Sequence, residues 1–321
     1  MKKLEFYIGN TDYDWFIFLK NLRPDEINFW QPGGKTRFHA INIGEPFLFR
    51  LGKGINKIAG VGFFSSNSIL PIDFAWEVFG EKNGVESLEF FRQKIASYRD
   101  PSNPIDKNPN IGCIILTNPV FFEENDWIEI PSWSRSIVQG RKYDMYSDEG
   151  NAIWEKVERI LEKQKFFEVE KEYKNQLVLD FPEEYPNKKY SEEFLTRARL
   201  GQGAFRVMIT DAYKRQCAVT GEKTLPVLDA AHIKPYDKSG PHSIRNGILL
   251  RTDIHKLFDR GYITITYDYR IEVSRKIKEE FDNGKNYYQF HGKSIITLPQ
   301  RINDRPSRQF IEWHNQNVYK E

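Results

Sequence analysis

Cysteine and long hydrophobic runs are scarce in this sequence of 321 residues. Only Cys113 and Cys217 occur, which excludes a disulfide network and any zinc site that needs three or four thiolates. So few cysteines favour a reducing compartment. No hydrophobic run approaches the roughly 20 residues of a transmembrane helix. Glu5 stands where a signal peptide carries its hydrophobic segment, so we expect a cytoplasmic protein with no membrane partner.

Aromatic residues, in contrast, are abundant. They make up 15% of the chain, and five of the seven tryptophans lie in the first 144 residues. The chain is long enough for two domains, and 40% hydrophobic with 29% charged residues is typical of a folded globular protein. Most of these aromatics are expected in the core, but one or two tryptophans can instead line a pocket for a flat ligand such as a base.

The small net charge of +2 hides an uneven distribution. Lys and Arg number 17 against 18 Asp and Glu in residues 1–144, 8 against 11 in residues 145–190, and 22 against 16 in residues 191–321. The net charges are therefore −1, −3 and +6. The C-terminal part is suited to a polyanion such as nucleic acid, whereas the N-terminal part has no general electrostatic preference for one.

Residues 1–146 mix strands and helices without regular alternation. Hydrophobic runs at 47–51 and 57–64, separated by glycines, predict a hairpin, and 111–117 predicts a buried strand. The spacing of apolar residues predicts short helices at 73–79 and 87–98, the second capped by Ser87. This combination favours an α+β domain or a small mixed β-barrel.

The middle of the chain predicts a connection. Residues 148 to about 174 have the spacing of a long amphipathic helix that packs on either domain or acts as a spacer. Two prolines and mixed charge at 181–190 indicate a linker. We therefore expect three parts: a domain at 1–146, a helix and linker at 147–190, and a second domain at 191–321.

The second domain carries the clearest chemical pattern. A helix at 204–215 precedes strands at 225–233 and 246–250, a helix that has Ile254, Leu257 and Phe258 on one face and ends at Gly261, and a hairpin at 262–274. His232 ends the first of these strands, Asn246 begins the second, and His255 and Asp259 share one face of the helix. Histidine can take a proton from water near neutral pH, and an imidazole with a carboxylate suits a divalent ion. A lone histidine on a strand is more often structural, but three such residues in this order favour a phosphodiesterase site.

The segments Asp229–Pro235, Arg245–Leu250 and Asp253–Asp259 resemble the HNH endonuclease family, in the branch of bacterial modification-dependent restriction enzymes. The resemblance implies a ββα-metal motif, with His232 as general base, Asn246 as a structural residue and His255 as a ligand of one Mg²⁺ or Mn²⁺. Many members carry another ligand immediately before the base, where this chain has Ala231. Its place can be taken by Asp259 or Asp229, although Asp259 can instead form an ion pair with a neighbouring arginine.

Many members also bind a structural zinc through Cys-x-x-Cys pairs. In this chain Thr220 stands at the partner position of Cys217, so we do not expect that zinc.

A second set of residues is expected to meet DNA. Basic side chains around the motif are candidates for phosphate contacts, with a solvated basic face as the alternative. They are Arg206, Lys234, Arg245, Arg251 and Lys256.

The N-terminal part has its own resemblance. A Gly-Glu-Pro-Phe-Leu-Phe strand at 44–49 followed by a Gly-x-Gly strand at 58–64 is similar to the PUA-like superfamily, which includes EVE, ASCH, YTH and SRA domains. That resemblance implies a reader of modified bases with an aromatic pocket, whose candidates are Phe29, Trp30, Phe63, Trp76 and Trp133.

Together these observations predict a metal-dependent DNA endonuclease of the restriction type that recognises modified cytosine in foreign double-stranded DNA, in an antiviral role. One ββα site cuts one strand, so a double-strand break needs a homodimer or two successive nicks.

Three alternatives to this function stay open. The N-terminal domain can read a phosphorothioate, RNA or a nucleotide signal; the chain can be a non-catalytic DNA-binding module; or it can be a secreted toxin nuclease, which the domain order disfavours.

Overall fold

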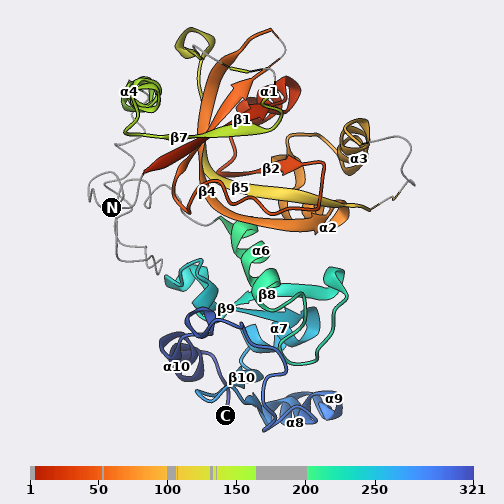
Figure 1. Ribbon diagram of the computed structural model, residues 1–321. Coiled ribbons are helices and arrows are strands. Elements are labelled where there is room, and N and C mark those ends of the chain that lie inside the picture. The colour runs from red at the N-terminus through yellow and green to blue at the C-terminus, as the bar shows by residue number, and fades with distance from the viewer. Residues whose placement is uncertain are drawn as a thin grey trace. The chain divides into compact units, whose positions relative to one another are not determined.

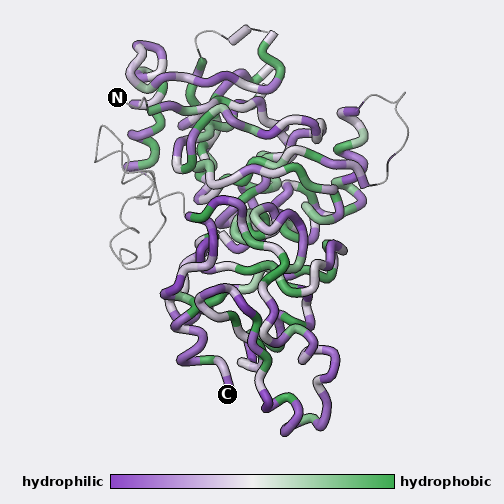
Figure 2. Tube along the Cα trace, turned by 60° about the horizontal axis from the view of Figure 1, so that its bottom comes forward, coloured by the Kyte–Doolittle hydropathy of each residue, from purple (hydrophilic) through white to green (hydrophobic). Residues whose placement is uncertain are grey.

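The computed structural model describes residues 4–52, 54–99, 106, 108–130, 133–134, 136–163 and 201–321. The chain divides into two compact units, residues 1–203 and 204–321. The expected linker at 181–190 and the end of the long helix beyond Lys163 lie outside the described residues. Figure 2 shows that hydrophobic and hydrophilic residues are interspersed along the whole trace. In the part of the chain that the structure describes, no helix has both the length and the hydrophobicity needed to cross a membrane.

A seven-stranded mixed sheet forms the centre of the N-terminal unit (Figure 1). Its strand order is β2-β5-β4-β3-β1-β7, with β6 paired to β4. Strand β1 runs parallel to β3, and the other pairs are antiparallel. The strands are β1 (Glu5–Thr11), β2 (Glu26–Gln31), β3 (Pro46–Leu51), β4 (Lys57–Pro71), β5 (Asn110–Phe121), β6 (Ile128–Glu129) and β7 (Gly140–Asp144); the helices are α1 (Tyr13–Leu22), α2 (Ile72–Phe79), α3 (Leu88–Ser97) and α4 (Asp148–Lys163).

Local sequence patterns located these elements well. The predicted hairpin is the antiparallel pair β3–β4, and the predicted buried strand lies within β5. The Ser87 hydroxyl accepts a hydrogen bond from the Phe90 N–H and caps α3, as its position before the apolar spacing indicated. Both predicted short helices are therefore confirmed.

Helix α4 packs on the N-terminal unit. Its apolar face buries Ile153, Trp154, Val157 and Leu161 in a cluster that also contains Phe6 of β1. Burial of this face removes apolar surface from water at roughly 25 cal/mol per Å². Of the two roles that the sequence allowed for this helix, packing against a domain is the one that its described turns adopt.

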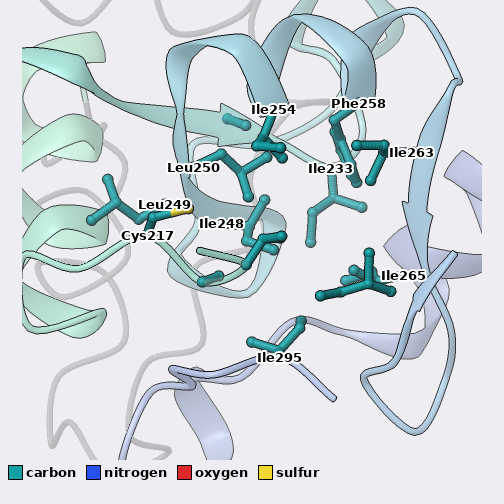
Figure 3. Close-up of a cluster of buried hydrophobic side chains, with 14 of the residues drawn as sticks. Cys217, Ile233, Ile248, Leu249, Leu250, Ile254, Phe258, Ile263, Ile265 and Ile295 are labelled. Carbon is teal, nitrogen blue, oxygen red and sulfur yellow. The ribbon is translucent and has the colours of Figure 1, made fainter. Parts of the chain in front are cut away.

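The C-terminal unit is built around a short hairpin and a helix. Strand β8 (Leu228–His232) pairs antiparallel with β9 (Gly247–Arg251), so that His232 faces Gly247 in the register, and α7 (Thr252–Asp259) follows directly. Figure 3 shows the core that joins them, where Ile248 and Leu250 of β9 meet Ile254 and Phe258 of α7. The remaining elements of this unit are α6 (Gln202–Ala212), which begins at the boundary between the units, β10 (Ile263–Ile265), β11 (Ile271–Val273), α8 (Lys276–Phe281), α9 (Lys285–Tyr288) and α10 (Arg308–Asn317). The predicted α+β class and the predicted order of strand, loop, strand and helix are confirmed.

Helix α10 was not predicted, and His314 attaches it to the rest of this unit. The side chain is 2% exposed, and its ring stacks on Phe258 of α7 at a centroid distance of 3.9 Å. Its Nδ1 lies 2.9 Å from the Thr264 hydroxyl, and its Nε2 lies 3.1 Å from the Phe258 carbonyl. Burial lowers the pKa of His314 from 6.5 to about 4, because a charged imidazole loses its hydration there.

We expect this buried histidine to make the stability of the protein depend on pH. Between pH 6.5 and about 4 the unfolded chain binds a proton at this position and the folded chain does not, so stability is lost as pH falls through this range. A shift of this size corresponds to about 3 kcal/mol. In denaturant unfolding at pH 7 and pH 4.5, His314→Gln should lose less stability on acidification than the parent. His39→Gln, which changes an exposed histidine, should keep the parental slope; equal slopes for all three proteins would contradict this assignment.

Candidate active site

Asn246 holds the loop between the two strands of the hairpin. It is fully buried at the end of the 3₁₀ helix η6 (Ile244–Asn246), one residue before β9. Its Oδ1 accepts the Lys234 N–H at 2.8 Å, and its Nδ2 donates to the carbonyls of Lys234 and Pro241, each at 2.9 Å. One side chain thus satisfies three backbone groups at both ends of the loop, because a buried amide must use its donors and acceptor. This geometry gives Asn246 a structural role in the site.

His232 stands at the last position of β8, where the strand enters that loop. Its ring stacks on Phe205 of α6 at a centroid distance of 3.9 Å and an interplanar angle of 13°. Its Nε2 lies 3.0 Å from Nδ1 of His242. Burial, followed by the positive charges that His242 and His255 can carry, lowers the pKa of His232 to about 4. The imidazole is therefore neutral near pH 7 and keeps a lone pair, which a general base requires.

His255 lies on α7 between two carboxylates. Its Nε2 is 3.2 Å from Oδ2 of Asp259, one helical turn further on, and its Nδ1 is 3.4 Å from Oδ2 of Asp229 on β8. Burial and the nearby charge of Asp229 raise the pKa of Asp259, whereas His255 acts in the opposite direction. The structure therefore brings all three sequence-predicted metal ligands together. The two carboxylates, however, face different nitrogens of the His255 ring.

The residues around Nε2 of His255 fit a divalent cation. When Nδ1–H points at Asp229, Nε2 carries a lone pair that faces the Asp259 carboxylate, an arrangement that a cation between them stabilises. The distance of 3.2 Å between Nε2 of His255 and Oδ2 of Asp259 is close to the distance between two adjacent ligand atoms on one ion, when each metal–ligand bond is about 2.1–2.2 Å. Asp229 is on the far side of the ring. Among the residues described, no group of three or more His, Cys, Asp or Glu side chains is arranged to hold a metal, so the fit to a cation rests on the two donors of His255 and Asp259.

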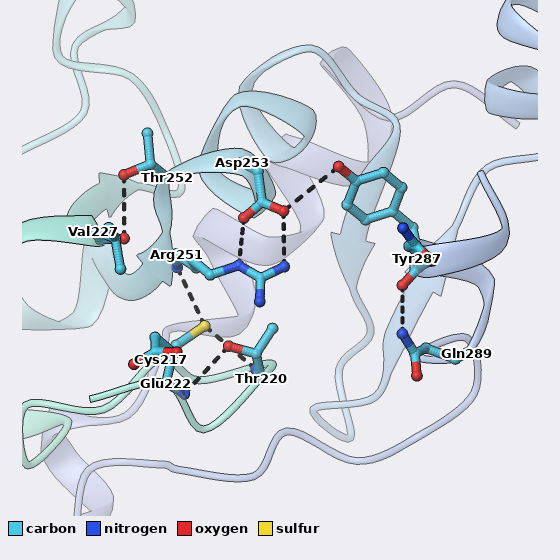
Figure 4. Close-up of polar contacts among 10 residues, drawn as sticks. Cys217, Thr220, Glu222, Val227, Arg251, Thr252, Asp253, Tyr287 and Gln289 are labelled. Carbon is cyan, nitrogen blue, oxygen red and sulfur yellow. Dashed lines mark hydrogen bonds and ion pairs between the residues drawn. The ribbon is translucent and has the colours of Figure 1, made fainter. Parts of the chain in front are cut away.

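Polar contacts around Cys217 hold the start of this unit against β9 (Figure 4). The buried Sγ accepts the N–H of Thr220 at 3.4 Å and the N–H of Arg251 at 3.2 Å. The guanidinium of Arg251 forms a bidentate ion pair with Asp253, at 2.6 and 2.8 Å. Cys217 and Thr220, which stand at the positions of a Cys-x-x-Cys pair, thus have hydrogen-bond partners within the chain.

The five basic candidates for DNA contacts differ in their surroundings. Arg251 is held by Asp253, which makes it a structural residue of the hairpin. Lys234 extends toward the ring of Trp313, with Nζ 5.5 Å from the ring centre. Lys256 is exposed on α7, and Arg206 and Arg245 are half-buried on α6 and η6. The predicted phosphate contact by Arg251 is thus the one that the structure disfavours.

The five aromatic residues predicted for a base pocket do not come together. Phe63 is fully buried in one core cluster, against which Trp133 packs. Phe29 contacts Trp15 and Phe47 in a second cluster. Trp30 and Trp76 instead lie near Phe91, with distances between ring centroids of 5.8 and 6.4 Å. The structure thus distributes the five candidates over separate places, in part because successive residues of a strand, such as Phe29 and Trp30, point to opposite faces of the sheet.

Part of the C-terminal unit matches a known protein family. Residues 217–266, which contain the β8–β9–α7 unit, match the model of the HNH endonuclease family. The ASCH protein from Zymomonas mobilis is 7% identical, covers 47% of this chain and 94% of its own, and superposes with a TM-score of 0.32. A modification-dependent restriction endonuclease, TagI, is 14% identical, covers 92% of this chain and 76% of its own, and has a TM-score of 0.27. No curated protein sequence matches the chain.

The fold and the matched segment together define the class of the C-terminal part. It contains an HNH endonuclease domain, and the chain is a nuclease. The predicted class of enzyme is thus confirmed, and DNA is the substrate that this class implies.

One neighbour of the predicted base was missed in the sequence. His242 was not among the predicted site residues, but the structure places its Nδ1 3.0 Å from Nε2 of His232. The available signal was its position four residues before Asn246, which fixes the end of the same loop.

Proposed function

We propose that this nuclease cleaves DNA at the site formed by His232, His255 and Asp259. The observation that carries the proposal is that Asn246 fixes the loop next to His232, while the helix that follows β9 carries the His255–Asp259 pair. Base and cation ligands therefore belong to one rigid hairpin–helix unit. Fixing the positions of reacting groups in advance lowers the entropic cost of reaching the transition state.

Each side chain has a separate task. The free lone pair of His232 accepts a proton from the attacking water, since the imidazole is neutral near pH 7. Nε2 of His255 and the Asp259 carboxylate hold the divalent ion, and Asp229 orients the His255 ring through Nδ1. A bound Mg²⁺ or Mn²⁺ stabilises the charge that develops on the phosphate and on the leaving oxygen. The exposed Lys256 on the same helix is a candidate for a flanking phosphate.

We further propose that the N-terminal unit selects DNA that carries modified cytosine. Support comes from the strand motifs at 44–49 and 58–64, which resemble base-reading domains, and from half-buried aromatic rings that keep surface for stacking. Trp30 and Trp76, whose rings both lie near the ring of Phe91, are the best candidates, because both remain partly exposed. Phe63 is excluded because none of its surface is exposed.

Matched DNA substrates test this function directly. The purified protein is incubated with Mg²⁺ or Mn²⁺ and plasmids of one sequence that carry cytosine, 5-methylcytosine, 5-hydroxymethylcytosine or glucosylated 5-hydroxymethylcytosine. We expect at least about tenfold faster cutting of one modified plasmid than of the unmodified one, with no cutting in EDTA. Nicked circles should precede linear DNA, because one site cuts one strand. Equal rates on all four plasmids would refute the modified-cytosine proposal and leave the nuclease assignment intact.

A further inference from the structure

His242 lies in the loop between β8 and β9, where contacts from the loop and from α6 hold its ring. Its ring stacks on Tyr236 at a centroid distance of 4.4 Å and an interplanar angle of 17°. The ring centroid of Phe205 lies 5.5 Å from that of His242. The preceding residue, Pro241, has its carbonyl fixed by Nδ2 of Asn246. The position of His242 is thus set by packing and by a buried hydrogen bond.

The contact between the two histidines limits which nitrogen of His232 can act. Nε2 of His232 faces Nδ1 of His242 at 3.0 Å, so one of these two nitrogens donates and the other accepts. If His242 donates, the single proton of neutral His232 lies on Nδ1 and no lone pair remains for water. If His242 accepts, Nε2 of His232 carries the proton and Nδ1 keeps its lone pair. Only the second arrangement leaves His232 able to act as a base.

We propose that His242 is a positioning residue that accepts a hydrogen bond from Nε2–H of His232 and so fixes Nδ1 of His232 as the atom that takes the proton from water. This inference rests on the proposed role of His232. When the proton has passed from water to Nδ1, the resulting imidazolium still donates Nε2–H to His242. The acceptor thus stabilises the positive charge formed on the base, as a hydrogen-bonded partner does in other acid–base pairs.

The same geometry also assigns an indirect role to Asn246. Its amide holds the Pro241 carbonyl, and the next residue supplies the acceptor for His232. Phe205 packs against both histidine rings and keeps them at hydrogen-bonding distance. The site therefore contains a continuous path of contacts from Asn246 through His242 to His232.

A pair of variants with nearly equal shape tests the proposal in the full-length protein. In His242→Asn the side-chain oxygen takes the place of Nδ1 and can accept from His232; in His242→Leu the branch point and volume are similar but no acceptor exists. On the plasmid that the parent cuts fastest, we expect His242→Leu to lower kcat at least about tenfold with KM for DNA unchanged. We expect His242→Asn to stay within about threefold of the parent.

A spectroscopic measurement separates this role from simple packing. Long-range ¹H–¹⁵N spectra of protein labelled at its histidines report which ring nitrogen carries the proton, and the signals lost in His232→Ala assign His232. The proton should lie on Nε2 in the parent and in His242→Asn, and should be shared between both nitrogens in His242→Leu.

The outcomes are distinct. Equal kcat values for the Asn and Leu variants, a change confined to KM, or a proton on Nδ1 of His232 in the parent would each overturn the positioning role. Full activity in His232→Ala would instead refute the proposed function itself.

Discussion

Replacement of His232 by alanine is expected to reduce DNA cleavage by about 10²–10⁴-fold. The variant removes the neutral imidazole at the end of β8, and the loop behind it is still held by Asn246, whose contacts are to backbone groups. Binding of the divalent ion should change little, because His255 and Asp259 lie on α7. The rate of nicking of supercoiled plasmid at saturating Mg²⁺ or Mn²⁺ measures the effect.

The control for this prediction is an exposed histidine in the same unit. His291→Ala should retain the parental rate, because its side chain lies on the surface. Since His232 also stacks on Phe205, the midpoint of thermal unfolding is compared in all three proteins to show that the domain remains folded. A His232→Ala protein that is folded and cuts at the parental rate would show that another group activates water and would refute the role of His232 as the base.

Local patterns predicted the catalytic unit because its chemistry depends on short-range spacing. The positions of His232 and Asn246 at facing ends of two strands follow from the length of the loop between them. The contact between His255 and Asp259 follows from the four-residue spacing on a helix, which the structure confirms at 3.2 Å. None of these relations depends on how distant parts of the chain pack.

The relations that local patterns could not predict depend on tertiary structure. Phe63 and Phe64 are successive residues of β4, so they point to opposite faces of the sheet, but the sequence does not say what covers each face. Phe63 enters one core cluster and Phe64 the other. Likewise, the contact between His242 and His232 depends on how the loop folds back, and neither composition nor periodicity carries that information. Arg251 was a candidate for DNA contact because it is a basic residue near the motif, and its ion pair with Asp253 is a tertiary contact that the sequence analysis did not predict.

The assignment of the carboxylates makes the second prediction with a large expected effect. Asp259→Asn removes a charged ligand next to Nε2 of His255, so we expect the affinity for Mn²⁺ to fall more than about 100-fold and cleavage to fall with it. Asp229→Asn removes only the partner of Nδ1, and an effect of about 10–100-fold is typical of a residue that orients a ligand. Titration calorimetry with Mn²⁺ and the metal dependence of the nicking rate measure both.

The ranking of these two variants decides between the two arrangements that the sequence left open. If Asp229 were the ligand and Asp259 the orienting residue, Asp229→Asn would have the larger effect on Mn²⁺ affinity, and high Mn²⁺ would restore Asp259→Asn more readily. Asp268→Asn, which changes an exposed aspartate paired with Arg270, should bind Mn²⁺ as the parent does. We favour Asp259 as the ligand because it lies one helical turn from His255 on the same element, so that the geometry of α7 alone sets the separation of the two donors. In the proposed arrangement Asp229 sets the ring angle from β8, and the cation needs no ligand at the position of Ala231.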